Sequence, residues 1–494
     1  MAAANRSKRV HGLLFAVVPF LLFGCGSGSG GGTAGGGIGG SGITVSAVSV
    51  GSVASFGSII VNDVEFETTN AEVVVEGEVR GTGDAAVTSL LSRGMVVRVE
   101  GRLDGERTGT AARVVFNDNV EGPVESITTL DTLVTELVVM GQTVRVDDRT
   151  VFQNAALGSI GVGNVLEVSG LVDEAGTIFA SYVNKRSDSL TPSAPVELKG
   201  IVQNLNTITR RFTINSLTID YTTAAVSGFS GADPLQGKLT EIKGRLIDPD
   251  TLVATSVVFE NELGRDDIDT AEIEGFVTQF TSISRFAVGT VVIATDGATV
   301  FNDVVAEDLG IGTRLKIRGS LNSRIVLADE VALADKVKLE SDVDSVDLQG
   351  GSLSLVGLYV GANSPNPIVI ATDASTKFTG VTGLNEIERG NHVKVFGRTT
   401  EIGDVIATKL LIKPGSGTVV LKGPAGVISP PSLLLWVLGV EINTSTIPPG
   451  SFVGKNGRPV SSSDFFSNLK TGDTVNASGT LAGQVVTWNA IESE

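Results

Sequence analysis

Few side chains in this sequence are suited to chemistry. Its 494 residues include one cysteine, Cys25, and two histidines, His11 and His392. An ordinary zinc site needs several thiolate or imidazole ligands, and a Ser-His-Asp or Cys-His arrangement needs a histidine beside its nucleophile. Acidic residues are plentiful, but no pair of carboxylates recurs at a spacing that singles it out for acid–base work. We therefore predict a protein that is not an enzyme, with no catalytic residue, no metal site and no cofactor.

The N-terminus has the layout of a secretory signal. Three basic residues precede an apolar run of 12 residues at positions 12–23. A helix that spans a bilayer needs about 20 apolar residues, so a retained membrane span is the poorer interpretation. Residues 1–24 are therefore interpreted as a signal peptide, and its removal would also remove His11.

The end of this signal, Leu22-Phe23-Gly24-Cys25, resembles the cleavage box of bacterial lipoproteins. In that box the cysteine thiol receives a diacylglyceryl group, although Phe23 departs from the small or β-branched residue usual at its position. The alternative is an ordinary secretory signal with a cysteine at its end by chance. We predict Cys25 as the lipid attachment site, with the membrane as a partner through this anchor. By resemblance to Gram-negative lipoproteins, Gly26 favours the outer membrane, on either face.

A flexible tether is predicted directly after the lipidated cysteine, within residues 25–42. Between positions 26 and 42, 11 of 17 residues are glycine. Such a segment buries too little apolar surface to fold, and its root-mean-square reach is about 20–25 Å. The tether therefore separates the anchor from the rest of the chain.

Beyond the tether, the same spacing between two glycines occurs six times and indicates where strands lie. A glycine is followed seven residues later by another, and the third and fifth residues between them are mostly apolar while the fourth is polar. This period of two predicts a half-buried strand, and we interpret the glycines as structural, at bends or bulges. The pairs are Gly94/Gly101, Gly163/Gly170, Gly237/Gly244, Gly312/Gly319, Gly390/Gly397 and Gly472/Gly479.

Each glycine pair belongs to a segment of about 65–80 residues with five or six short apolar runs and no convincing helical period. This pattern predicts a small antiparallel β-barrel, of which the OB-fold is the commonest five-stranded form. The predicted fold class is all-β, a tandem array of six OB-like barrels after a signal peptide and a flexible glycine-rich tether. The predicted barrels span residues 43–119, 120–188, 196–261, 271–335, 336–413 and 417–494.

The first repeat carries a family resemblance. Its opening strand at 50–53, the run Ile60-Val61-Asn62-Asp63-Val64-Glu65-Phe66 and the paired-glycine strand at 93–101 resemble the bacterial family called domain of unknown function 5666. Repeats two to four are similar to it in part, and repeats five and six fit by the paired glycines. The resemblance implies a β-barrel repeat of exported bacterial proteins, and it transfers no catalytic residue.

Composition argues against nucleic acid as a partner. The formal net charge is −18, and removal of the three basic residues of the signal makes the charge of the mature chain −21. No basic stripe is present to neutralise phosphates, and OB-folds that hold single strands or sugars use exposed aromatic platforms. We interpret the phenylalanines, such as Phe116, Phe259 and Phe301, as core residues. Trp436 and Trp488 are the remaining candidates for a contact surface.

Three other candidates have simple interpretations. His392 occupies the second position of the fifth paired-glycine strand, where we predict a residue near the barrel surface. Neither acidic cluster has the alternating ligands and terminal glutamate of an EF-hand loop, so we predict solvated turns. The clusters are Asp342, Asp344 and Asp347, and Asp266, Asp267 and Asp269.

Two functions remain open from the sequence. The first is a non-enzymatic, membrane-tethered lipoprotein that acts as a spacer or interaction scaffold at the cell envelope, with an envelope protein or polymer as its partner. As an upper bound, six barrels in line would extend on the order of 170 Å. The alternative is an extracytoplasmic module that binds an oligosaccharide or Ca²⁺ in barrel mouths or inter-barrel grooves.

Overall fold

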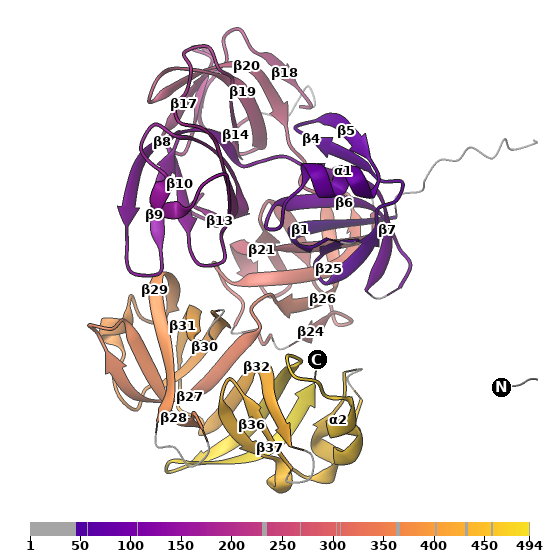
Figure 1. Cartoon of the computed structure of the whole chain (residues 1–494), viewed down its shortest axis with the longest axis vertical. Helices are drawn as coiled ribbons and strands as arrows, with labels where there is room; N and C mark the ends of the chain where they lie inside the picture. The colour runs from indigo at the N-terminus through magenta and orange to yellow at the C-terminus, as the bar shows by residue number, and fades with distance from the viewer. Residues whose placement is uncertain are drawn as a thin grey trace, which may run out of the picture. The chain divides into compact units, whose positions relative to one another are not determined.

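The computed structural model describes residues 46–493, apart from residues 57, 106, 230–234, 267, 303, 307, 362–365, 401–402, 430–432 and 456–457. The predicted signal peptide, the lipid site Cys25 and the glycine-rich tether lie outside the described residues. Nearly all of the described elements are strands (Figure 1). No helix in this part of the chain is both long enough and apolar enough to cross a membrane.

We number the segments one to six in chain order. Segment one contains β1 (Ala47–Ser55), β2 (Ile59–Val61), β3 (Val64–Glu67), β4 (Glu72–Val75), β5 (Glu78–Thr82), α1 (Asp84–Leu90), β6 (Val96–Leu103) and β7 (Thr108–Phe116). Segment two contains β8 (Val120–Thr129), β9 (Thr135–Val139), β10 (Gln142–Val146), β11 (Val151–Gln153), η1 (Leu157–Ser159), β12 (Val165–Val172) and β13 (Ile178–Ser187).

The described elements of segments three and four are all strands. Segment three contains β14 (Val196–Ile201), β15 (Gln203–Asn206), β16 (Arg211–Ile214), β17 (Leu217–Asp220), β18 (Ala225–Ser227), β19 (Leu239–Asp248) and β20 (Thr251–Phe259). Segment four contains β21 (Ile268–Ser282), β22 (Arg285–Val288), β23 (Val291–Ala294), β24 (Val300–Asn302), β25 (Arg314–Asn322) and β26 (Ile325–Leu333).

Segments five and six add short helical turns. Segment five contains β27 (Val337–Asp347), β28 (Ser352–Tyr359), β29 (Pro367–Thr379), η2 (Leu384–Glu386), β30 (His392–Thr399) and β31 (Val405–Lys413). Segment six contains β32 (Thr418–Ser429), β33 (Leu434–Val437), β34 (Val440–Asn443), η4 (Thr444–Thr446), η5 (Pro449–Ser451), β35 (Phe452–Val453), α2 (Ser462–Asn468), β36 (Thr474–Ala482) and β37 (Val485–Ser493).

Segments one, two, four and five each close a circuit of five strands, and segment three closes a similar one whose opening strand is interrupted into β14 and β15. In segment two, β8 pairs with β9 and β12, β10 pairs with β9 and β13, and β12 pairs with β13. The predicted all-β, OB-like barrel is therefore confirmed. The expectation of wholly antiparallel barrels is wrong, because the third and fifth strands of the circuit run parallel, as β10 and β13 do, and the short strand β11 also pairs in parallel with β13. A parallel pair needs a crossover connection, which here carries the fourth strand.

Segment six has the same strand order with an incomplete circuit. Its strands β32, β36 and β37 pair as in the other segments, and β33 pairs with β32 and β34. Among the described residues β34 has no ladder with β37, whose parallel neighbour is instead the two-residue strand β35. The residues after β34 form two 3₁₀ turns, which displace the edge that closes the other barrels.

The first glycine of each pair lies in the turn that precedes the fourth strand of its barrel. All six of these glycines have a positive φ, which an L side chain rarely adopts. Each donates its N–H to a carbonyl in or directly after the opening strand; Gly94, with φ 88°, donates to Val53 at 2.9 Å. At this position the repeat therefore needs glycine for its conformation.

The second glycine of each pair lies at a β-bulge between the fourth and fifth strands, inside the strand that the alternation predicts. There a Cβ would lie no more than 2.5 Å from a backbone carbonyl oxygen of the facing strand. At this position the repeat therefore needs glycine for space rather than for a positive φ. The ladder shifts register at Gly101, Gly170, Gly244, Gly319, Gly397 and Gly479.

The opening strands join the barrels in pairs (Figure 1). β1 pairs with β21, β8 with β14, and β27 with β32, so segment one shares a sheet with segment four, two with three, and five with six. A simple array in line would hold segments one and four apart, whereas β1 and β21 pair in parallel from Ala47 with Thr270 to Val50 with Ile273. The in-line arrangement used for the upper bound on length is therefore wrong.

The buried apolar side chains follow the same pairing of segments. One continuous core contains residues of segments two and three, and another contains residues of segments five and six. Segments one and four have separate cores, with Val48 of β1 packed in the core of segment four. The short helices α1 and α2 were not predicted; each is seven residues long and buries one or two side chains against its own barrel.

Candidate functional site

The outward face of the paired-glycine strands lies against neighbouring segments. Lys316 of segment four pairs with Asp63 of segment one. Lys394 of segment five lies 3.0 Å from Asp308 Oδ1 of segment four, and that carboxylate is fully buried. The alternation in the sequence identified the two faces of these strands. The polar face, however, is much less exposed to solvent than the sequence suggested. A further polar group of this kind surrounds Glu241 of β19.

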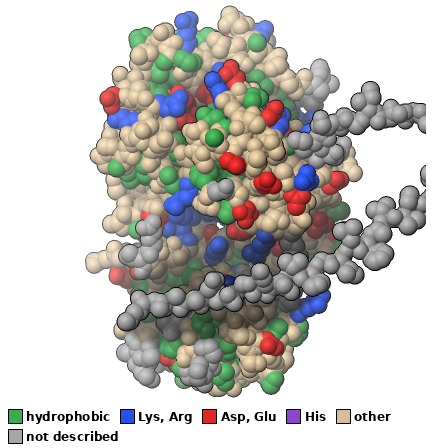
Figure 2. All heavy atoms as spheres, turned by 45° about the vertical axis from the view of Figure 1, so that its right-hand side comes forward, with side chains coloured by type: hydrophobic (Ala, Val, Ile, Leu, Met, Phe, Trp, Pro, Cys, Tyr) green, Lys and Arg blue, Asp and Glu red, His purple; other side chains and the backbone are tan. Residues whose placement is uncertain are grey.

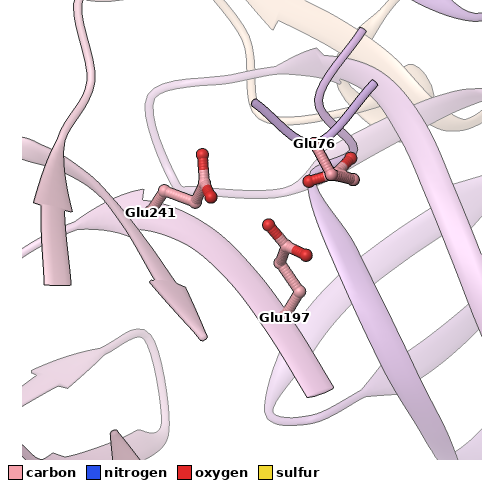
Figure 3. Close-up of side chains that lie close together, drawn as sticks. All are labelled: Glu76, Glu197 and Glu241. Carbon is pink, nitrogen blue, oxygen red and sulfur yellow. The ribbon is translucent and has the colours of Figure 1, made fainter. Parts of the chain in front are cut away.

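Three glutamates lie close together (Figure 3), and the ammonium group of Lys243 contacts all three. Glu76 comes from the turn between β4 and β5, while Glu197 and Glu241 come from β14 and β19, and one oxygen of each lies within 4.8 Å of the other two. Lys243 Nζ lies 2.8 Å from Glu197 Oε1, 3.1 Å from Glu241 Oε1 and 3.6 Å from Glu76 Oε2. We call Glu76, Glu197 and Glu241 the glutamate cluster; it links segments one and three.

Further acidic groups adjoin the glutamate cluster. Asp118, which is 3% exposed, donates its backbone N–H to Glu76 Oε1 at 3.0 Å. Asn117 Nδ2 donates to Glu260 Oε1 at 3.1 Å. Nine buried side-chain atoms of the described residues lack a hydrogen-bond partner, and four lie here. They are Glu76 Oε2, Asn117 Oδ1, Asp118 Oδ1 and Glu197 Oε1. The two glutamate oxygens contact Lys243 as ion pairs.

Retained protons reduce this concentration of buried negative charge. Burial raises the pKa of Glu197 to about 10, and a hydrogen bond shared with Glu76 adds to the shift. Burial also raises the pKa of Glu260 to about 7 and that of Asp118 well above its usual range. Buried carboxylates without enough cationic partners hold protons because the charged form is poorly solvated. The cluster can therefore share protons between segments, and the Lys243 ammonium occupies the place that a metal ion would take.

Stability should fall as pH rises, through the carboxyl group of Glu260. Its folded pKa, about 7, lies above its ordinary value of 4.5, so its contribution is fully present below pH 4.5 and is lost as pH rises through 7. In Glu260→Gln, the loss of unfolding free energy between pH 4.5 and 8 should shrink by on the order of 1–3 kcal/mol. Urea unfolding at both pH values measures this loss. Glu78→Gln is the control, because the Glu78 side chain is 68% exposed; equal pH dependence in wild type and Glu260→Gln would contradict the prediction.

A cavity of about 480 Å³ lies beside this cluster. Residues of segments one to four line it, among them Glu260 and the side chains of Asn117, Gln142 and Asn215. Asn215 Nδ2 donates to Gln142 Oε1 at 2.7 Å, so these amides are held in fixed orientations between segments two and three. Amides and carboxylates around one cavity can donate to and accept from the hydroxyl groups of a polar ligand.

The paired glycines differ in their relation to this cavity. Gly170 and Gly237 are among the residues that line it, whereas Gly101, Gly244 and Gly479 are not. These three lie at the bulges of segments one, three and six, where the space beside each is filled by backbone of the facing strand. The barrel therefore requires glycine at these three positions, and none of the three contacts the candidate site.

The histidine that we predicted to lie near a barrel surface, His392, is buried. His392 is 3% exposed; its Nδ1 lies 2.8 Å from Asp342 Oδ1, and its Nε2 lies 3.2 Å from Glu340 Oε1. The prediction of a residue near the barrel surface is therefore wrong: Glu340 and Asp342 of β27 contact the ring, and Ser416 Oγ, from the stretch between segments five and six, lies 3.3 Å from Nε2. No second imidazole or thiol accompanies it among the described residues.

The candidate aromatic contacts do not form a shared surface. Trp488 is 4% exposed and belongs to the core of segments five and six, so the expectation that it contacts a partner is wrong. Trp436 on β33 is half-buried. Of the predicted core phenylalanines, Phe116 is buried, while Phe259 and Phe301 are partly buried.

The two acidic sequence clusters do not converge on a common point. Asp344 pairs with Arg389 at 3.2 Å, and Asp347 Oδ1 accepts backbone N–H groups of its own turn, while Asp342 contacts His392. In the other cluster Asp266 pairs with Arg324, and Asp267 lies outside the described residues. Sequence reasoning missed the glutamate cluster because its members are separated along the chain and meet only through contacts between barrels.

Three stretches of the chain match the model of a protein family described as a domain of unknown function, DUF5666. The matched residues are 121–184, 274–332 and 343–410, within segments two, four and five. The predicted resemblance is therefore confirmed, and the DUF5666 unit recurs along the chain. Segment one, which we predicted to be the best match, is not among the matched stretches. A search of curated proteins finds no match to this chain.

Proposed function

We propose that this chain of DUF5666 repeats is a non-enzymatic, lipid-anchored interaction scaffold of the cell envelope. The observation that carries the proposal is the pairing of opening strands, β1 with β21, β8 with β14 and β27 with β32. Continuous sheets hold the barrels together in pairs. Buried ion pairs add to this, through the polar side chains on the outward faces of the strands. Such a chain presents several barrel ends on one framework, which favours a scaffold over an extended spacer.

The signal peptide and Cys25 support the proposed location. Acyl chains on Cys25 would hold the protein at a membrane, by resemblance to the outer membrane if the cell has two, because each buried CH₂ contributes about 0.8 kcal/mol. The glycine-rich tether would give the barrels freedom to reach an envelope protein or polymer. The net negative charge of the chain opposes nucleic acid as that partner.

One experiment tests anchor and scaffold together. Wild type and Cys25→Ser are compared by membrane fractionation, and wild type is then cross-linked in intact cells and recovered with its partners. We expect Cys25→Ser to leave the membrane fraction or to retain its signal, and wild type to capture a reproducible envelope protein or polymer. Normal processing with unchanged membrane association would overturn the anchor, and repeated cross-linking without any partner would overturn the scaffold.

The cavity of about 480 Å³ favours ligand binding as a second candidate. Its fixed amides, Gln142 and Asn215, suit the hydroxyl groups of an oligosaccharide. Calcium at the glutamate cluster would have to displace the Lys243 ammonium, so the carbohydrate is the better candidate. A ligand that binds only the native state raises the melting temperature. Thermal-shift measurements with glycans and with Ca²⁺ separate these cases, and no shift with any glycan would count against this function.

A further inference from the structure

A second cavity has the opposite charge character to the glutamate cluster. Its volume is about 210 Å³, and residues of segments one, two, four and five line it. Four arginines and a single carboxylate, that of Asp147, are among them, although the formal charge of the whole chain is −18. Figure 2 shows Lys and Arg side chains gathered near the middle of one face. The arginines that line this arginine cavity are Arg93, Arg145, Arg149 and Arg314.

Two of these arginines have unused donors. Within the described part of the chain, the exposed side chain of Arg93 forms no ion pair and no hydrogen bond. Arg314 Nη2 lies 2.5 Å from Glu274 Oε1, but its buried Nε has no acceptor. A buried donor without an acceptor is costly, so Arg314 Nε is available to an oxygen that enters the cavity.

The other two arginines are held in place. Arg145 Nη1 donates to the carbonyl of Ala374 at 2.9 Å, and its guanidinium carbon lies 5.9 Å from the centre of the Phe179 ring. Arg149 Nη2 lies 2.7 Å from Asp147 Oδ2. Arg398 also reaches this carboxylate oxygen, at 3.5 Å, and pairs with Asp148 at 2.6 Å.

A smaller recess of about 30 Å³ extends the positive charge. Arg149 and Arg314 line it too, together with Arg398, Lys377 and Lys409. Its two carboxylates are those of Asp335 and Asp373. Seven cationic side chains and three carboxylates line the two hollows. Besides Arg314, three of the cations pair with carboxylates outside the lining, Arg145 with Glu136, Lys377 with Asp173 and Arg398 with Asp148. The region is partly shielded from solvent, and there charges interact more strongly than in bulk water.

We propose that the arginine cavity binds a compact oxyanion of the phosphate class. A planar guanidinium presents paired N–H donors that match phosphate oxygens, and several such groups from different segments surround one small volume. A volume of about 210 Å³ accommodates a phosphate group with a small substituent. The oxyanion is either free phosphate or the phosphate of a glycerophosphate headgroup. Because four segments contribute to the cavity, the bound anion would also hold them together.

Calorimetric titration of the full mature chain in detergent tests the proposal. The probes are inorganic phosphate and glycerol 3-phosphate, with glycerol as the uncharged control. Arg93→Gln should weaken binding of the preferred anion roughly tenfold, the usual effect of losing a charged hydrogen bond. Arg93→Lys should recover part of the affinity, because it restores the charge without the paired donors. The matched control is Arg80→Gln, since Arg80 is 52% exposed, pairs with Glu78 and lines neither hollow.

The variant at Arg93 separates binding from folding, because this side chain forms no ion pair and no hydrogen bond within the described residues. Its melting temperature without phosphate should equal that of wild type. Tighter binding of glycerol 3-phosphate identifies a headgroup as the source, and tighter binding of inorganic phosphate identifies the free ion. Absence of binding by either anion, or equal affinities in wild type and Arg93→Gln, would overturn the proposal.

Discussion

Gly319→Ala should destabilise segment four by about 3 kcal/mol, near the upper end of the cost of overpacking a core. Gly319 lies at the bulge between β25 and β26, where a Cβ would overlap the carbonyl oxygen of Leu327 and lie 2.7 Å from Ala328 Cα. Both of those atoms are backbone, so no side-chain rotation can relieve the contact. The ladder between the fourth and fifth strands must therefore shift or break.

Two alanine substitutions in the same segment serve as controls. A Cβ at Gly297 meets nothing within 4 Å, so Gly297→Ala should be close to neutral. Gly312 has a φ of 79°, and Gly312→Ala should cost about 1 kcal/mol or somewhat more through backbone strain. Urea unfolding, with hydrogen exchange to localise the effect in β25 and β26, measures the series. A Gly319→Ala variant as stable as Gly297→Ala would show that the bulge is not required.

Among substitutions at the glutamate cluster and the lysine that it contacts, Lys243→Met should reduce the stability of the protein most. Removing one partner of a buried ion pair costs about 3–5 kcal/mol, and we expect about 2–3 kcal/mol here, since the Lys243 side chain is 34% exposed. The loss arises mainly because the Glu241 carboxylate would keep its burial but lose the ammonium group that lies 3.1 Å from it. It should be smaller at pH 5 than at pH 8, where fewer carboxyls hold protons.

A double variant distinguishes lost charge from lost packing. Burial would raise the pKa of Glu241, but hydrogen bonds from Glu197 and Glu260 and the Lys243 ammonium lower it, so its carboxylate is charged at neutral pH. Glu241→Gln removes that charge, and combined with Lys243→Met it should recover part of the loss at pH 8. Unfolding free energies of the four proteins give the coupling between the two side chains. Equal losses at pH 5 and pH 8, with no recovery in the double variant, would assign the effect to packing.

The sequence by itself determined the barrel. Alternation in strands such as β6 follows from the two-residue period of an extended chain, and the glycine pairs reflect backbone requirements that recur in every copy. Val97 and Val99 are buried, as that period predicts. Local chemistry also predicts a signal peptide that ends at a cysteine, because such features depend on residues that are close together in the chain.

Only the tertiary structure decided which barrels meet. The opening strands of segments one and four pair although more than two hundred residues separate them, since an exposed strand edge can pair with any suitable edge that packing brings near. That pairing buried polar side chains that the alternation placed on an outer face. It also gathered Glu76, Glu197 and Glu241 around Lys243, and Arg93 with Arg314 around one cavity. The repeat pattern is local, whereas both sites arise from contacts between copies, and the sequence of one copy contains no information on its neighbours.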